Sequence, residues 1–129
     1  MTGSLGRTAE GLKTGLAKLK EVRKEFETEL FIPGSKEGLN VELDKAIRLN
    51  DFITMGELIA YDALNRNESC GGHFREEYQT EEGEAKRDDE NFFYVACWEY
   101  QGSDDKAPVL YKEPLVYEAI KVQTRNYKS

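Results

Sequence analysis

The residues with the most reactive side chains lie together in one short segment, Cys70-Gly71-Gly72-His73. A neighbouring histidine can lower the pKa of a thiol, so a cysteine nucleophile is conceivable here. Such a nucleophile also needs a third group that orients the base, and the sequence offers no evident one. Two adjacent glycines allow positive φ and a close approach of the backbone. We therefore expect a turn with a structural or interface role.

The sequence also offers few residues for metal binding or for acid–base catalysis. A closed zinc site needs four nitrogen or sulfur ligands, and the candidates are Cys70, His73 and Cys97. Glu76 and Glu77 would point to different faces of a helix, so they do not form a paired general acid and base. No dinucleotide fingerprint, phosphate loop or nucleophile elbow occurs. We expect no catalytic, cofactor-binding or metal-binding residue in this chain.

The composition narrows the class of protein. The 129 residues suit one domain, with 33% charged and 39% apolar residues. A formal net charge of -7 argues against a nucleic-acid partner, because affinity for phosphates needs a basic surface. No apolar run is long enough to span a bilayer, and the N-terminus lacks the apolar stretch of a signal peptide. We expect a soluble intracellular chain whose two cysteines are reduced.

The first predicted element is an amphipathic helix over 8–30. Thr8 is its expected N-cap, and a proline and a glycine at positions 33 and 34 end it. Its apolar side, with spacings of three and four, is formed by Leu12, Leu16, Leu19, Val22, Phe26 and Leu30. Its solvent side is expected to carry Lys13, Lys18, Lys20, Glu21, Arg23, Lys24 and Glu25.

A second helical pattern begins at Asn40, the expected N-cap. One long helix over 41–66 fits the pattern, and so do two helices joined near Asn50-Asp51. Gly56 in its interior costs about 1 kcal/mol relative to alanine. We therefore expect another backbone to pack closely at this glycine.

The second half of the chain changes character. Residues 74–90 contain eight acidic and three basic residues, which predicts a solvated loop. The aromatic run over 92–100, a turn over 102–105 and a return strand over 109–112 predict a hairpin that ends at Pro114. Partial alternation predicts a further short extended segment over 115–123.

One segment resembles a family signature: Ala63-Leu64-Asn65-Arg66-Asn67-Glu68-Ser69-Cys70-Gly71-Gly72-His73-Phe74-Arg75-Glu76-Glu77. It is similar to flavoprotein subunits of succinate dehydrogenase and fumarate reductase, where a helix ends in Ala-Leu-x-Arg-x-Glu-Ser-Arg-Gly-Ala-His and x-Arg-Glu-Asp follows. The segment 87–92, the aromatic hairpin and the stretch 112–115 also resemble this family, so that the resemblance covers 6–128. Cys70 and Gly72 depart from the usual Arg and Ala.

The resemblance implies a C-terminal scaffold domain of an enzyme that interconverts succinate and fumarate. Members of the family are several times longer, and their FAD and catalytic residues lie upstream. We therefore expect this chain to be inactive alone and to bind no FAD. The implied partners are the FAD-binding domain of the same subunit, an iron–sulfur subunit and a membrane anchor, which would place the protein in the cytoplasm, peripheral to the inner membrane.

Six residues of the signature are the expected contacts with the FAD-binding domain: Arg66, Glu68, Ser69, His73, Arg75 and Glu76. The alternative for these residues is local. Gly71 could cap the C-terminus of the preceding helix, with Arg66 near the negative end of the helix dipole.

The expected fold is mainly α: antiparallel helices of a truncated three-helix bundle, then a loop and a small C-terminal β-hairpin. The family resemblance adds one further helix before Gly6. The regions are an N-terminal stub over 1–7 (residues 1–5 are compatible with an expression tag), a helical part over 8–67, the Cys-Gly-Gly-His turn and acidic loop over 68–91, and the aromatic hairpin and tail over 92–129.

Two other functions stay open. The chain could be an independent acidic domain whose aromatic hairpin binds a protein, or the C-terminal domain of an L-aspartate oxidase, which has a similar Glu-Ser-Arg-Gly motif. Two helices without the third leave an apolar face uncovered, so we also expect the isolated chain to self-associate. The faces buried in such an oligomer would surround Leu16, Leu19, Ile47 and Ile59.

Overall fold

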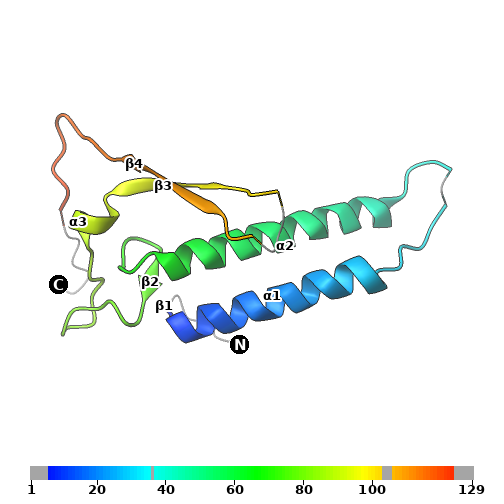
Figure 1. Ribbon diagram of the computed structural model, residues 1–129, viewed down its shortest axis with the longest axis horizontal. Helices are drawn as coiled ribbons and strands as arrows, with labels where there is room; N and C mark the ends of the chain where they lie inside the picture. Colours follow the sequence, from blue (N-terminus) through cyan, green and yellow to red (C-terminus); the bar gives the residue numbers. More distant parts are fainter. Residues whose placement is uncertain (1–5, 36, 103–105, 124–129) are drawn as a thin grey trace. The chain divides into compact units, whose positions relative to one another are not determined.

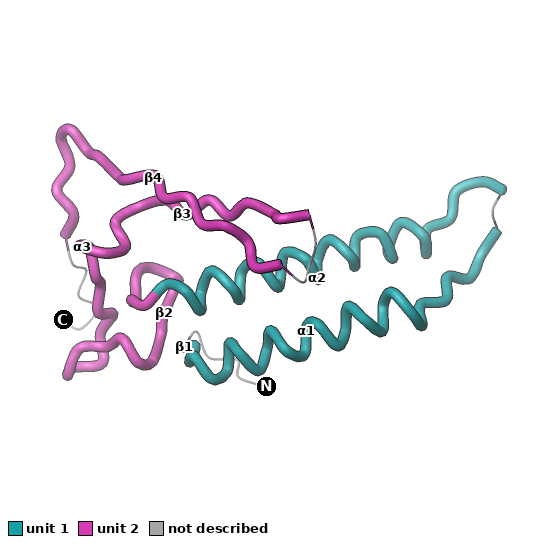
Figure 2. The backbone as a smooth tube through the Cα atoms, viewed as in Figure 1, with its two compact units in different colours: residues 1–66 teal, residues 67–129 magenta. Residues whose placement is uncertain are grey.

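The computed structural model describes residues 6–35, 37–102 and 106–123 (Figure 1). The chain divides into two compact units, residues 1–66 and 67–129 (Figure 2). Residues 1–5 of the expected stub, most of the expected turn over 102–105 and the end of the tail lie outside the described residues. The elements are β1 (Gly6–Arg7), α1 (Ala9–Glu29), α2 (Val41–Asn65), β2 (Phe74–Arg75), α3 (Asp89–Phe92), β3 (Tyr94–Glu99) and β4 (Val109–Pro114).

The first unit contains α1 and α2, and their predicted N-caps are confirmed. The Thr8 hydroxyl accepts a hydrogen bond from the Gly11 N–H at 3.0 Å. The Asn40 side-chain oxygen accepts from the first-turn N–H groups of residues 42 and 43, at 3.1 and 3.2 Å. Each contact satisfies N–H groups that have no partner inside a helix. The second pattern forms one continuous helix, so the two-helix alternative is wrong.

The two helices run antiparallel and pack against each other (Figure 1). The predicted apolar stripes are only partly buried: Ala46, Ile53 and Ala63 are buried, whereas Val22, Ile47 and Ile59 are exposed. The methyl groups of Leu19 lie 3.8 Å from where a Cβ of Gly56 would be. The neighbour of this glycine is therefore a side chain and not the expected backbone. A Cβ at 3.8 Å is in ordinary contact, so the packing in this unit does not require glycine there.

Arg23 is buried between α1 and α2, so its predicted place on the solvent side is wrong. Its Nη2 donates to Thr54 Oγ1 at 3.1 Å and to Glu57 Oε2 at 2.5 Å. The position lies four residues after Leu19 and three before Phe26, which places it in the apolar stripe. The spacing alone places Arg23 in the apolar stripe, but its charge led to the prediction of an exposed side chain.

The second unit contains the predicted hairpin. β3 and β4 pair antiparallel, with Tyr94 opposite Pro114 and Cys97 opposite Tyr111. The proline ends the ladder, as expected for a residue without an N–H donor. Residues 115–123, predicted as a short extended segment, join no strand ladder. Tyr117 instead packs its ring edge-on against the ring of Phe93, with centroids 5.8 Å apart.

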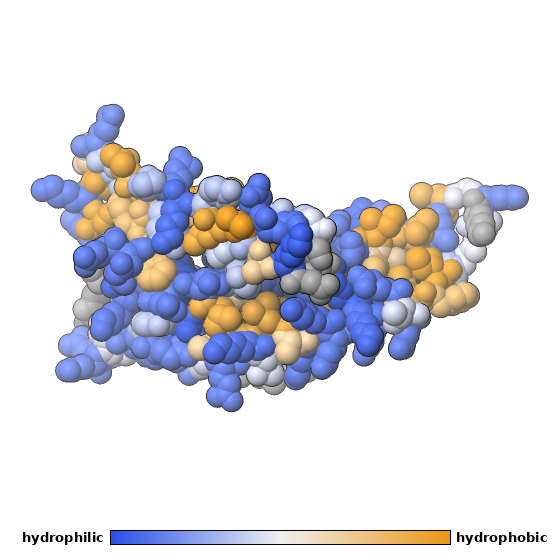
Figure 3. Space-filling model, viewed as in Figure 1, coloured by the Kyte–Doolittle hydropathy of each residue, from blue (hydrophilic) through white to orange (hydrophobic). Residues whose placement is uncertain are grey.

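Large apolar side chains remain exposed where α1 connects to α2. Phe31 and Leu39 are 83% and 93% exposed, and Val41 and Leu43 next to them are also exposed. Figure 3 shows hydrophobic residues gathered at this end of the helical pair. Among the described residues, no helix is long and apolar enough to cross a bilayer.

Candidate functional site

The Cys-Gly-Gly-His segment forms a tight two-residue turn. The Cys70 N–H donates to the His73 carbonyl at 2.8 Å, and the His73 N–H donates back to the Cys70 carbonyl at 3.0 Å. Gly71 has φ of +56°, as the first central residue of a primed hairpin turn requires. A Cβ at Gly71 or Gly72 would meet no described atom within 4 Å. The glycines therefore serve the conformation of the turn, and the expected close backbone approach is not observed.

Of the capping alternative, the role of Gly71 is wrong, whereas Arg66 does lie at the C-terminal end of α2. α2 ends at Asn65, and Arg66 itself is the cap residue, with φ of -89° and ψ of 97°. The Arg66 N–H still donates to the Asp62 carbonyl at 3.0 Å. Gly71 lies five residues beyond this cap and belongs to the next turn.

Three of the six expected interface residues are buried, and two of them hold the segment together. Ser69 is completely buried, and Arg75 is 2% exposed. The Ser69 hydroxyl accepts from the Arg75 N–H at 2.8 Å and donates to the Arg75 carbonyl at 3.1 Å. One serine side chain thus satisfies both backbone groups of a buried residue. Its loss would leave a buried N–H and C=O without that partner.

Glu68, the third buried residue, ties the segment to a later part of the chain. Its Oε2 accepts from the Asp88 N–H at 2.9 Å, and the adjacent Ser69 N–H donates to the Lys86 carbonyl at 2.9 Å. Asp88 is in turn the N-cap of α3, where it accepts from the Asn91 N–H. The motif therefore positions the start of α3. Sequence reasoning noticed the family-like segment 87–92 but not this link to it.

The Arg75 guanidinium has two neighbours from the following residues. Its Nε donates to Glu77 Oε2 at 3.0 Å, and its Cζ lies 5.3 Å from the centre of the Tyr78 ring. An arginine over an aromatic face is favoured by the ring quadrupole. The remaining expected interface residues are accessible, because Glu76 is exposed and Arg66 and His73 are half-buried.

The acidic run is an ordered turn and not an irregular loop. The Gly83 N–H donates to the Thr80 carbonyl and the Thr80 N–H to the Glu84 carbonyl, both at 2.9 Å. Gly83 has φ of +80°, which explains the glycine. Glu81 and Glu82 at its tip are exposed, as predicted for a solvated acidic segment.

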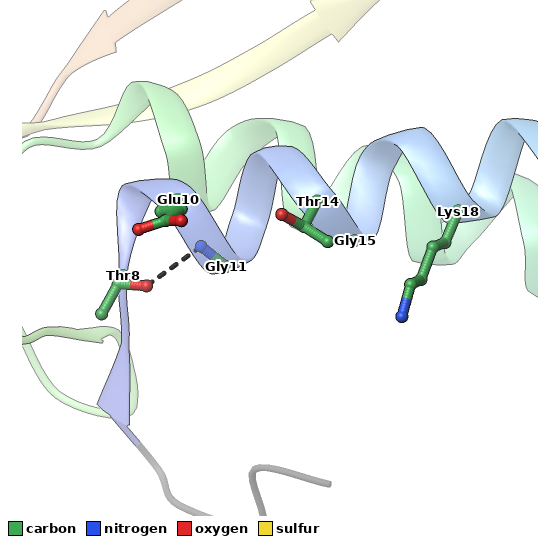
Figure 4. Close-up of a pocket in the computed structure, with 6 residues that line it drawn as sticks. All are labelled: Thr8, Glu10, Gly11, Thr14, Gly15 and Lys18. Carbon is green, nitrogen blue, oxygen red and sulfur yellow. Dashed lines mark hydrogen bonds between the residues drawn. The ribbon is translucent and has the colours of Figure 1, made fainter.

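A shallow hollow of about 440 Å³ lies on α1 (Figure 4) and is lined by Thr8, Glu10, Gly11, Thr14, Gly15 and Lys18. It does not fit FAD. A dinucleotide pyrophosphate binds at a helix N-terminus after a glycine-rich loop, whereas here the carboxylate of Glu10 occupies the first turn. Within the described ranges, no three His, Cys, Asp or Glu side chains are arranged to hold a metal ion.

The chain matches a known family over nearly its whole length. Residues 3–127 match the family described as fumarate reductase flavoprotein C-term. A fumarate reductase flavoprotein subunit from Serratia sp. is 34% identical over 86 residues, which is 67% of this chain and 14% of the relative. The chain thus spans about a seventh of the length of that curated relative.

Solved structures show the same fold. A variant of E. coli quinol fumarate reductase FrdA superposes with a TM-score of 0.75 at 24% identity, covering 94% of this chain and 20% of that one. A quinol-fumarate reductase solved with menaquinol molecules gives a TM-score of 0.72 at 26% identity, covering 92% of this chain and 19% of that one. The chain corresponds to about a fifth of each of these chains.

Proposed function

Because the chain belongs to the family of fumarate reductase flavoprotein C-terminal domains, we propose that it is a scaffold domain of such a flavoprotein. The whole subunit would interconvert succinate and fumarate and exchange electrons between FAD and an iron–sulfur subunit. In this proposal FAD and the catalytic residues belong to the upstream domains. This chain contributes surface and rigidity, and no catalytic group.

One observation carries the proposal: the buried residues of the family signature use their side chains for hydrogen bonds within their own unit. Ser69 and Glu68 use their side chains on backbone groups of the same unit. A residue that already satisfies buried backbone groups is poorly suited to acid–base or nucleophilic work. The rigid turn it supports presents His73 and Glu76, and we propose that these two, with Arg66, contact the FAD-binding domain.

The exposed apolar end of the helical pair supports a second contact with the rest of the subunit. Monomeric proteins rarely expose side chains such as Phe31 and Leu39 together. We also propose that α1 and α2 belong to a three-helix bundle in the longer polypeptide. The complex would hold the subunit at the cytoplasmic side of the inner membrane through its iron–sulfur and anchor subunits.

A mixing experiment tests the scaffold role. The upstream part of a matching flavoprotein is expressed without this region, and the 129-residue chain is added. Copurification and a gain in succinate oxidation with an artificial electron acceptor are the expected results. Oxidation of L-aspartate in place of succinate would favour the L-aspartate oxidase alternative. No association, with a stable isolated chain, would favour an independent acidic interaction domain.

Matched variants then locate the interface. His73→Ala and Glu76→Ala should weaken association by about tenfold each, the scale of a lost hydrogen-bonded contact. Glu81→Ala removes an equally exposed carboxylate from the neighbouring acidic turn and should leave association unchanged. Equal effects of Glu76→Ala and Glu81→Ala would indicate a general charge effect and reject the proposed contact.

A further inference from the structure

α2 carries an apolar stripe on a side that does not face α1. Phe52, Met55 and Ile59 are 69%, 53% and 54% exposed. The side of α2 that meets α1 is marked by buried Ile53 and by Gly56 against Leu19. At 100° per residue, the exposed stripe is centred roughly 120° around the helix from Ile53. The contact with α1 therefore cannot cover it.

Charged residues continue the same stripe at both ends. Asp44 and Arg48, which form an exposed ion pair with each other at 3.0 Å, precede the three apolar residues, and Asp62 and Arg66 follow them. From 44 to 66 the stripe advances in steps of four, four, three, four, three and four residues, which is the spacing of a coiled-coil seam. Its order is acid, base, three apolar residues, acid, base.

This order is complementary to itself when one copy is reversed. An antiparallel pair of α2 helices centred on Met55 places Arg48 opposite Asp62 of the other copy. Arg66 keeps the contact with the FAD-binding domain proposed above, and the register does not depend on it. Phe52 then meets Ile59 of the other copy, and the two Met55 side chains meet at the centre. A parallel pair would instead set each charge opposite an identical charge, which is unfavourable.

We propose that this stripe of α2 is the interface between two copies of the chain, paired antiparallel about a two-fold axis at Met55. A two-fold interface uses the same surface on both copies, so a self-complementary stripe is what it requires. The proposal does not depend on the scaffold function. It uses a different surface from the one expected from the sequence, since Leu19 faces Gly56 and only Ile59 of the four expected residues lies in the stripe.

Light scattering and sedimentation velocity on the full 129-residue chain test the interface. The unsubstituted chain should show a concentration-dependent dimer. Met55→Lys brings two ammonium groups together at the axis and should raise the dimer Kd by at least about 100-fold, since two buried methionines are also lost. The matched control is Ile47→Lys, because Ile47 is equally exposed on another side of α2. It should leave the Kd unchanged, with helix content checked by circular dichroism for both variants.

Variants with reversed charges test the antiparallel register without removing an apolar side chain. Arg48→Glu alone and Asp62→Lys alone each set like charges opposite and should weaken their own homodimers by about tenfold. Arg48→Glu also removes the ion pair with Asp44 within α2, and circular dichroism of this variant checks that the helix is kept. A mixture of the two variants restores opposite charges at both positions and should form a heterodimer about as tight as the original homodimer.

Three outcomes would overturn the proposal. The first is a strictly monomeric chain at millimolar concentration. The second is a dimer that Met55→Lys and Ile47→Lys weaken equally. The third is a mixture of the charge variants that associates no better than either variant alone. If the chain is monomeric and Met55→Lys instead reduces binding to the upstream flavoprotein, the stripe is occupied by the same subunit and the self-pairing is rejected.

Discussion

The two units of the chain differ in what holds them together. The first unit, residues 1–66, has 11 acidic and 10 basic residues, and two long helices pack along apolar stripes with one ion pair between them. The second unit, residues 67–129, has 14 acidic and 8 basic residues and thus carries -6 of the net charge of -7. Its 67–91 region relies on polar side chains that bind backbone groups.

This difference predicts how each unit responds to substitution. A helical pair distributes its stability over many similar contacts, so a single exposed change matters little. A segment held by a few buried hydrogen bonds depends on each of them, because a buried group left without its partner is costly. The exception in the first unit is its one buried charge, and it gives the largest expected effect.

Arg23→Ala should destabilise the helical unit by about 3 kcal/mol, because it leaves Glu57 partly buried without its partner. Urea unfolding followed by circular dichroism measures this change. Lys24→Ala, on the exposed side of α1, is the matched control and should change the free energy of unfolding by less than about 0.5 kcal/mol.

Replacing the whole pair separates charge burial from packing. Arg23→Met combined with Glu57→Leu should recover most of the lost stability, since an apolar pair of similar size needs no desolvation of charge. A double variant as unstable as Arg23→Ala would show that the geometry of the hydrogen bonds, including the one to Thr54, is what matters.

Ser69→Ala should cost about 2 kcal/mol in the second unit, because the buried N–H and C=O of Arg75 lose their partner. Hydrogen exchange should accelerate over 69–86 and stay unchanged in α1 and α2. Ser35→Ala, at an exposed hydroxyl in the connection between the helices, is the control and should have no comparable effect. Uniform acceleration across the chain would contradict the distinction between the units.

The smallest expected effect is at the hairpin. The Tyr111 hydroxyl donates to Glu99 Oε2 at 3.1 Å, and this hydrogen bond, with the carboxylate charge, raises the pKa of Tyr111 above its usual value of 10.0. A raised pKa means that the contribution to stability is complete below pH 10 and is lost as the pH rises through the higher pKa of the folded state. Ultraviolet titration of phenolate should show a late transition that Tyr111→Phe removes, and Glu99→Gln should remove the delay. A titration that Glu99→Gln leaves unchanged would contradict this contact.

Helices and strands were readable from the sequence because their residues repeat. The three- and four-residue spacings located α1 and α2, and hydroxyl and amide side chains before them located both caps. The aromatic run located β3. Arg23 was predicted to be exposed because charged side chains are normally exposed. The repeating pattern does not indicate which charged residue is buried.

The candidate site was only partly readable for a related reason. The adjacent glycines placed the turn at residues 70–73, but the partners of the Ser69 N–H and of the Glu68 carboxylate lie 17 and 20 residues later, in a segment without periodicity. Contacts of this kind depend on the path of the chain between them. The same applies to residues 115–123, which lie in no strand and where the ring of Tyr117 packs against Phe93.

The contact of Arg23 with Thr54 and Glu57 has a consequence for insertions. It fixes the register of α1 against α2, so the register does not depend on the length of the connection over 30–40. Lengthening a flexible connection costs little, only about 0.6 kcal/mol for each doubling. A longer connection should therefore keep the pairing of the two helices, while it disturbs the contact proposed above for Phe31 and Leu39.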